Sequence, residues 1–227
     1  QRTQSTQMVY DCAAMRNVLI LLLLASSASA QSWKFGVAGD SRNCGDVVMP
    51  SIAAGVKASN AAFYWHLGDY RAIYKVDEDM EHASKTPFTV RSYRAAAWPD
   101  FIRNQVGPFS PTPVFLAIGN HEMVLRNRGD FVSQFGDWLT RSEIQQQRLS
   151  DDANDHAVRT YYHWIQGGVD FISMDNASSD LFDNAQVAWA TRVLDLDAAA
   201  ARVHAGCPCR HAPLPLSPGR DRRLPPL

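Results

Sequence analysis

The sequence carries no excess of charge of either sign: 22 basic and 23 acidic side chains give its 227 residues a formal net charge of -1. A near-neutral chain gives no support to nucleic acid or an anionic membrane surface as a default partner. The longest apolar run, residues 18–25, falls well short of the roughly 20 apolar residues that a membrane-spanning helix needs. We therefore expect no nucleic-acid-binding patch and no stable membrane span, and the oligomeric state stays open.

Cysteine is scarce, with four residues at positions 12, 44, 207 and 209. If residues 1–30 are removed as a secretory leader, three cysteines remain, and an odd number of cysteines defines no disulfide framework. The Cys207-Pro208-Cys209 segment offers too few ligands for a zinc site. Hydrophobic residues, in contrast, make up 46% of the chain and include six Trp, seven Tyr and ten Phe. This content excludes disorder across the whole chain and is enough for one sizeable core.

The first thirty or so residues have the pattern of a secretory signal. Met15 and Arg16 precede the apolar run, and small residues with an A-x-A site follow it up to Ala30, as in a signal peptide cleaved at that point. We expect residues 1–30 to be upstream residues plus a signal peptide that starts at Met15, and the protein to be secreted or periplasmic. A membrane anchor is the alternative, and the short run argues against it.

Residues 201–227 form an anomalous Pro- and Arg-rich tail. Six of the 12 prolines lie between Pro208 and Pro226, and the hydrophobic periodicity stops near Ala201. We expect this tail to be disordered or to result from a frameshift, because the codons of residues 210–212 can be chosen so that a neighbouring frame reads Gly-Met-His. Residues 31–200 remain as one partial domain.

Strand-like and helical patterns alternate inside that domain. Short apolar runs predict buried strands over residues 34–38, 61–67 and 114–118. Apolar residues at helical spacing predict a helix over 47–58, with its first turn near Pro50. Strands and helices that alternate with short connections are typical of a mainly parallel sheet covered by helices, which is an α/β fold.

Three further elements are expected. A helix is predicted over 90–106, and alternation on either side of Gly167-Gly168 predicts a hairpin of residues 160–166 and 169–174. Asp183 can cap a helix over 184–196. The apolar residues available for the buried side of that last helix are Val187, Trp189, Val193 and Leu194.

The three predicted parallel strands end alike, in glycine and then a side chain that can bind a metal. The three segments are Gly39-Asp40, Gly68-Asp69 and Gly119-Asn120-His121-Glu122. The carboxyl ends of parallel strands share one edge of the sheet, so Asp40, Asp69, Asn120 and His121 should converge there. Carboxylate, amide and imidazole groups suit hard or borderline divalent metals. Each glycine would permit a tight turn and a close ligand approach.

This ordered set resembles the calcineurin-like metallophosphoesterases, including the purple acid phosphatase branch. The resemblance runs from about Lys34 to Leu196 and extends to the segment VDFISMDNAS and to Gln186-x-x-Trp189. It implies a four-layer α/β/β/α sandwich whose C-terminal part is missing here. It also implies an enzyme, a phosphoric ester hydrolase, acting on a small-molecule or macromolecular phosphomonoester or phosphodiester.

The resemblance assigns a role to each matching position. It implies that Asp40 binds a first metal ion, that Asp69 bridges two ions, and that Asn120 binds the second. The cofactors implied are two divalent or trivalent ions of the Fe, Zn or Mn type. His121 would contact phosphate or assist protonation of the leaving group. Two such ions clamp the attacking and leaving oxygens, and they lower the pKa of bound water to near 7.

The sequence departs from the family pattern in three places. Arg42 stands where the family has a histidine, and a guanidinium cannot bind a metal but can grip phosphate bidentately. We therefore place Arg42 with His121 as a catalytic residue. Ala72 replaces the tyrosine of a coloured Fe(III)–tyrosinate site, which is therefore not supported. The later histidine motifs are absent and would lie beyond Asp197, so activity of this chain should be impaired.

Two hypotheses from different classes remain. One is the metal-dependent phosphoesterase. The other is a non-catalytic module that binds phosphate or a phospho-ligand through Arg42 and Arg71 without metals. A phosphatase with an aspartyl nucleophile would need Asp-x-Asp after the first strand, and Arg42 takes the second aspartate's place. Around the site, Glu122 is expected either to support the metal ligands or to be a charge at a helix start, rather than to bind a metal itself. His66 is expected to be a hydrogen-bonded core histidine.

Overall fold

The computed structural model describes residues 32–71, 75–177 and 182–204, with side chains described up to residue 196. The predicted leader, residues 1–30, and residues 205–227 of the predicted tail lie outside these ranges. Residues 201–204 belong to the last helix. Among the helices of the described ranges, none combines the length and the apolar content that crossing a bilayer requires.

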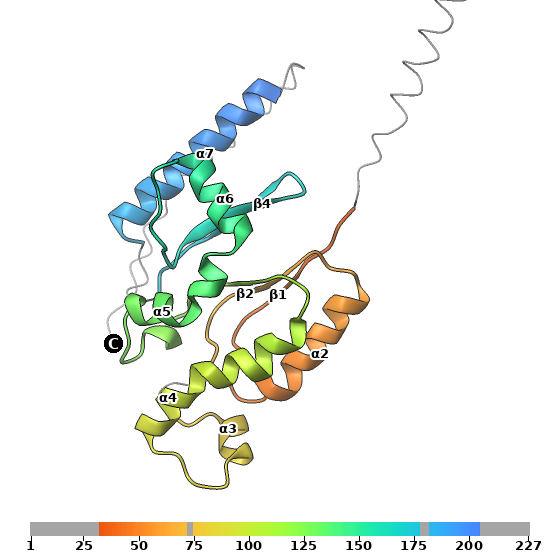
Figure 1. Cartoon of the computed structure of the whole chain (residues 1–227), viewed down its shortest axis with the longest axis vertical. Coiled ribbons are helices and arrows are strands. Elements are labelled where there is room, and N and C mark those ends of the chain that lie inside the picture. The colour runs from red at the N-terminus through yellow and green to blue at the C-terminus, as the bar shows by residue number, and fades with distance from the viewer. Residues whose placement is uncertain (1–31, 72–74, 178–181, 205–227) are drawn as a thin grey trace, which may run out of the picture.

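A three-stranded parallel sheet lies at the centre of the molecule (Figure 1). Its strands are β1 (Gly36–Ala38), β2 (Tyr64–His66) and β3 (Val114–Leu116), in the order β1-β2-β3. Val37, Trp65 and Phe115 lie side by side across the strands. The predicted strands are confirmed, and the fold is mixed α/β with one small parallel and one small antiparallel sheet.

Helices from the strand connections cover one face of this sheet. The segments are α2 (Gly45–Ala58), α4 (Val90–Phe101), the π-helix Ile102–Val106 and the 3-10 helix Gly107–Phe109. The short helix α3 (Glu78–Ala83) packs on α4, where Met80 forms a separate buried cluster with Tyr93 and Ala97. Phe109 stacks on Tyr64 of β2, with ring centroids 4.2 Å apart, and Phe101 meets the His66 ring edge-on. The helix predicted over 90–106 is confirmed, with a change to π geometry at Ile102.

The expectation that the first long helix begins near Pro50 is wrong. Helix α2 begins at Gly45, after Cys44 in a left-handed conformation. Pro50 lies in its second turn, where it forfeits the hydrogen bond that an N–H would make to the carbonyl of Asp46. A contact distant in sequence supports the earlier start, because the Asp46 N–H donates to the Asp79 carboxylate at 3.0 Å.

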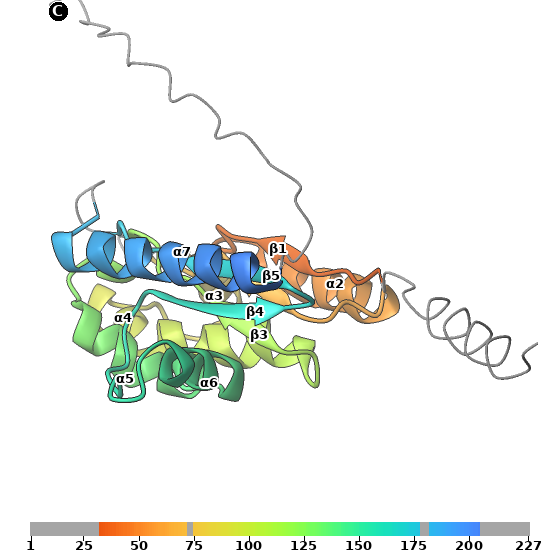
Figure 2. The same cartoon turned by 90° about the horizontal axis from the view of Figure 1, so that it is seen from above.

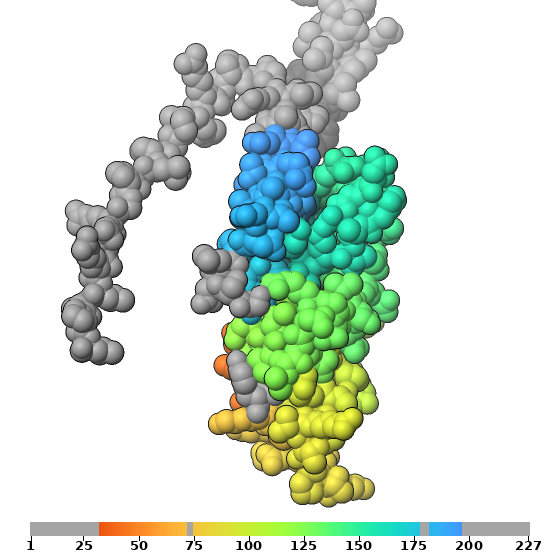
Figure 3. Space-filling model, turned by 90° about the vertical axis from the view of Figure 1, so that its left-hand side faces the viewer, coloured from red at the N-terminus to blue at the C-terminus, as the bar shows by residue number. Residues whose placement is uncertain are grey.

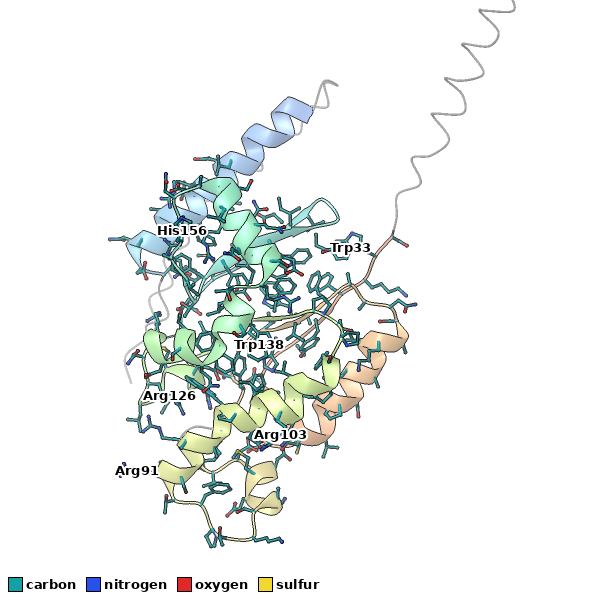
Figure 4. The ribbon with its side chains drawn as sticks, viewed as in Figure 1. Trp33, Arg91, Arg103, Arg126, Trp138 and His156 are labelled. Carbon is teal, nitrogen blue, oxygen red and sulfur yellow. The ribbon has the colours of Figure 1, made fainter. Side chains whose placement is uncertain are left out.

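The antiparallel sheet is the predicted hairpin, and it packs on the other face of the parallel sheet. Its strands are β4 (Tyr162–Gln166) and β5 (Val169–Ser173), joined by glycines with φ of 58° and 80°. The Trp164 ring stacks on Phe115 at 3.9 Å, and Phe171 meets Phe63 edge-on at 5.0 Å. Trp33 lies beside this hairpin (Figure 4), with its ring 5.8 Å from Phe171.

The remaining helical segments of the described residues are the 3-10 helix His121–Met123 and the helices α5 (Arg128–Leu139), α6 (Ser142–Asp151) and α7 (Asn184–His204). The hairpin lies between α6 and α7 when seen from above (Figure 2). In space-filling view the yellow α3–α4 region, the green region around α5 and the blue α7 follow one another along one side of the molecule (Figure 3).

Helix α7 confirms its predicted cap and corrects its predicted face. The N–H of Gln186 donates to the Asp183 carboxylate at 2.8 Å. Val193 is buried, but Val187 and Leu194 are 47% and 58% exposed, so their assignment to the buried side is wrong. They are seven residues apart on one stripe, whereas Gln186 takes the buried stripe with Val193. A polar residue there is stable because its amide is hydrogen-bonded to backbone.

His66 is a fully hydrogen-bonded core histidine, as expected. Its Nδ1 accepts from the N–H of Gly68 at 3.2 Å, so Nε2 carries the hydrogen and donates to the Ser41 hydroxyl at 2.8 Å. That hydroxyl donates to Gln105 at 2.6 Å. Burial lowers the pKa of His66 to about 3, because the charged imidazolium would lose its hydration.

This pKa predicts a pH-dependent stability. The unfolded chain takes up a proton near pH 6.5 and the folded chain only near pH 3, so the free energy of unfolding should fall as the pH drops between these values. The limiting slope from one such group is about 1.4 kcal/mol per pH unit. Urea unfolding followed by tryptophan fluorescence at several pH values should show a shallower slope for His66→Asn. His82→Asn, at an exposed histidine, should keep the original slope, and equal slopes in all three proteins would contradict the assignment.

Candidate metal and phosphate site

The three predicted metal ligands lie together at the carboxyl edge of the parallel sheet. They line a polar hollow of about 410 Å³. Its walls are formed by Asp40, Leu67, Gly68, Asp69, Ile118, Gly119, Asn120, Asn176 and Ala177. Of the four residues expected to converge, the structure brings Asp40, Asp69 and Asn120 to this hollow, whereas His121 is not among its lining residues. The segment after β5 adds Asn176.

Both aspartates have an unusual backbone conformation. Asp40 has φ of 54° and Asp69 has φ of 58°, in the left-handed region that L-residues enter at a cost. Asp40 does not cap the following helix, because the residue before α2 is Cys44 and no side chain caps there. Strained conformations that persist at one edge of a sheet cluster at functional sites, so the geometry favours a functional role for both residues over a turn-forming one.

Glycines bring the ends of β2 and β3 into direct contact. A Cβ on Gly68 would lie 2.4 Å from the nitrogen of Gly119, and a Cβ on Gly119 would lie 2.3 Å from Asp69 Oδ1. Neither distance is tolerated between real atoms. We expected these glycines to let a ligand approach closely. What the structure shows is that, because neither residue has a side chain, the ends of β2 and β3 can approach each other.

Glu122 ties these two strand ends together. Its buried carboxylate accepts the backbone N–H groups of Asp69, Tyr70 and Gly119 at 2.8, 2.9 and 2.8 Å. Burial raises the pKa of Glu122 to about 7 against the opposing effect of these three hydrogen bonds. The residue thus lies behind the hollow and fixes the backbone of Asp69, which matches its expected supporting role.

His121 and Arg42, the predicted catalytic pair, contact each other. His121 Nδ1 lies 3.2 Å from the carbonyl oxygen of Arg71, which can only accept, so Nδ1 carries the hydrogen. Nε2 therefore accepts from the Arg42 guanidinium at 2.5 Å. Nε2 also lies 3.9 Å from an oxygen of Asp69. The ring is nearly buried and its backbone N–H donates to Asp69 at 3.1 Å, so the two strand ends hold it in a fixed orientation.

Arg71 is not available to phosphate, which corrects the expectation that it grips a phospho-ligand with Arg42. Its side chain is fully buried among carboxylates and pairs with Asp46 at 2.7 Å, with Asp77 at 3.0 Å and with Asp100. A buried guanidinium needs such partners to offset the loss of hydration. No sequence pattern signalled this cluster, because its members come from different helices and loops.

The side chains in the hollow suit a hard divalent cation. Asp40 is 71% exposed and Asp69 is 15% exposed at the side chain, and Asn120 adds an amide. Carboxylate and amide oxygens are ligands of Mg²⁺, Mn²⁺ and Ca²⁺. Within the described ranges no group of three or more His, Cys, Asp or Glu side chains is placed to hold a metal.

The fold and the hollow define a mixed α/β protein with an oxygen-rich polar site at the carboxyl edge of its parallel sheet. In comparisons with known proteins, no family model, no curated protein and no solved structure matches the chain.

Because the two strand ends are in contact, adding one methyl group at Gly119 should lower the free energy of unfolding. Gly119→Ala should destabilise the protein by about 1–3 kcal/mol, since its Cβ would overlap backbone and side-chain atoms of Asp69. Gly55→Ala, on an exposed turn of α2 with nothing within 4 Å, should instead stabilise by about 0.5–1 kcal/mol. Urea unfolding measures both, and equal stability of the two variants would refute the close approach.

Proposed function

We propose that the protein is a metal-dependent hydrolase of phosphate esters that acts in this hollow. The observation that carries the proposal is the convergence of Asp40, Asp69 and Asn120 on one polar hollow, with both aspartates held in left-handed conformations. Residues of this kind at the carboxyl edge of a parallel sheet are the usual setting for ligand chemistry.

Each side chain has a defined task in this proposal. Asp40, Asp69 and Asn120 would hold a metal ion, and Asp69 is the residue that the resemblance implies as a ligand shared with a second ion. A bound cation supplies Lewis-acid activation of water and neutralises charge on the phosphoryl oxygens. Arg42 donates to the phosphate, for which a guanidinium has five N–H groups.

His121 would act once substrate has engaged Arg42. Its Nδ1–H stays on the carbonyl of Arg71, which keeps the ring in place. Its Nε2, now the acceptor from Arg42, can then take up a proton from solvent water and either donate it in a hydrogen bond to a phosphate oxygen or pass it to the leaving oxygen. In this proposal Arg42 binds the phosphate when substrate is present and hydrogen-bonds Nε2 of His121 when it is absent.

The same proposal includes the four-layer architecture of the fold and the secreted or periplasmic location of the protein. A four-layer α/β/β/α sandwich is supported by helices on one face of the parallel sheet and by the hairpin on the other. Export to the periplasm or outside the cell follows from the signal peptide expected within residues 1–30. The paired metal ions and the substrate class rest on the resemblance of the three Gly-led segments.

One observation favours a non-catalytic phosphate-binding module instead. The Arg42 guanidinium lies 3.9 Å from Asp40 and hydrogen-bonds His121, so a fixed positive charge already lies beside one carboxylate of the hollow. Such a module would bind inorganic phosphate through Arg42 whether or not a metal is present. Binding that persists unchanged in EDTA and disappears in Arg42→Ala would select this function.

The enzyme proposal predicts loss of turnover on removal of the Asp69 carboxylate. Asp69→Asn should lower metal-dependent hydrolysis of p-nitrophenyl phosphate by about 100-fold or more, because even partners of metal ligands are worth 10–100-fold. Asp137→Asn, at an exposed aspartate of α5, is the matched control and should retain full activity. Undiminished turnover in Asp69→Asn would sink the role assigned to this carboxylate.

A further inference from the structure

A fourth polar residue reaches the hollow from a part of the chain that the three Gly-led segments do not include. Asn176 follows β5 and lines the hollow with Asp40, Asp69 and Asn120. Asn176 is exposed, while both of its neighbours, Asp175 and Ala177, are buried. This alternation anchors the chain on either side and leaves the amide of Asn176 at the surface of the hollow.

The anchoring of Asp175 is unusually complete. Arg128 binds its carboxylate with two nitrogens, Nε at 2.7 Å and Nη2 at 2.8 Å, and the hydroxyl of Thr160 donates to the same group. The side-chain amide of Gln186 accepts from the Asp175 N–H at 2.5 Å and donates to its carbonyl at 2.7 Å. Three separate elements therefore hold one residue by both its side chain and its backbone.

The electrostatics agree with a permanently charged anchor. Burial alone would raise the pKa of Asp175, but hydrogen bonds from Arg128, Thr160 and the Ala177 N–H outweigh it and hold the pKa below its usual value. A bidentate ion pair of this kind, with Asp175 buried and Arg128 partly exposed, contributes little net stability compared with apolar packing, but it fixes geometry to within a fraction of an ångström. Such rigidity is useful where the next side chain must meet a ligand.

We infer that Asn176 is a substrate-contacting residue of this hollow, where its amide NH₂ donates to a phosphoryl oxygen, and that Asp175 is the residue that positions it. The inference rests on the proposed function for the identity of the ligand. A neutral amide donates to an anionic oxygen without a second fixed positive charge beside the cation site. In this arrangement Asn176 supplies a neutral hydrogen-bond donor to the phosphate and Arg42 supplies the positive charge.

Binding of inorganic phosphate tests this inference separately from catalysis. Calorimetric titration of phosphate, with Mn²⁺ present, should show about tenfold weaker binding in Asn176→Ala, the typical cost of one hydrogen bond to a charged group. Asn176→Asp should bind more weakly still, because a carboxylate repels phosphate. Asn154→Ala, at an exposed asparagine outside the hollow, is the control and should bind as the original protein does. Bacterial expression avoids glycosylation of the Asn176-Ala177-Ser178 sequon.

Each outcome decides the question. Phosphate affinity that is unchanged in Asn176→Ala overturns the inference, and so does a loss of Mn²⁺ affinity, which would make Asn176 a metal ligand. Weaker phosphate binding in a protein that shows no turnover supports the inference and removes the hydrolase proposal. If the original protein binds no phosphate, the Asn176 inference and the hydrolase proposal are both contradicted.

The kinetics give a second test where turnover is present. Asn176→Ala should raise KM about tenfold, and Asp175→Asn should raise KM and also lower kcat. The Asp175→Asn result counts only if the near-ultraviolet spectrum of that variant is native.

Discussion

The candidate site depends on a single buried carboxylate. Glu122 accepts three backbone N–H groups from the ends of β2 and β3, and without it these donors would be buried with no acceptor, at a cost of about 1–3 kcal/mol each. Burial raises the pKa of Glu122 to about 7, because the ionised carboxylate that accepts these N–H groups has lost its hydration. The two adjacent glycines permit the close approach of the two strand ends, and Asp69 and Asn120 are brought to one surface by it.

Two further hydrogen-bonded systems connect this surface to the rest of the fold. On the helical side, His66, Ser41 and Gln105 form a chain that continues through the Gln105 amide to Asp46, a partner of buried Arg71. On the hairpin side, Asp175 links α5, the segment before β4 and α7. The residues that face the hollow are thus set on a rigid frame, in which polar contacts fix the orientation that aromatic packing alone would leave loose.

The sequence allowed prediction of features that depend on local pattern. Apolar runs that end in Gly-Asp or Gly-Asn located the parallel strands and the residues at their ends, and Gly167-Gly168 located the hairpin. Features set by contacts distant in sequence were missed or wrong. The burial of Arg71 depends on carboxylates from three segments, and the exposure of Val187 follows from the buried Gln186. The contact of Arg42 with His121 joins residues that are 79 positions apart in the sequence. Periodicity carries no information about such pairs.

The central claim is that Asp40, Asp69 and Asn120 form a cation site whose shape Glu122 maintains. Titration with Mn²⁺, followed by electron paramagnetic resonance of the free ion, measures it without any substrate. The predicted result is saturable binding that is lost when Asp40 and Asp69 are both changed to asparagine and weakened about 10–100-fold in Glu122→Gln. Equal Mn²⁺ affinity in all three proteins, or no binding in the original one, would contradict the claim.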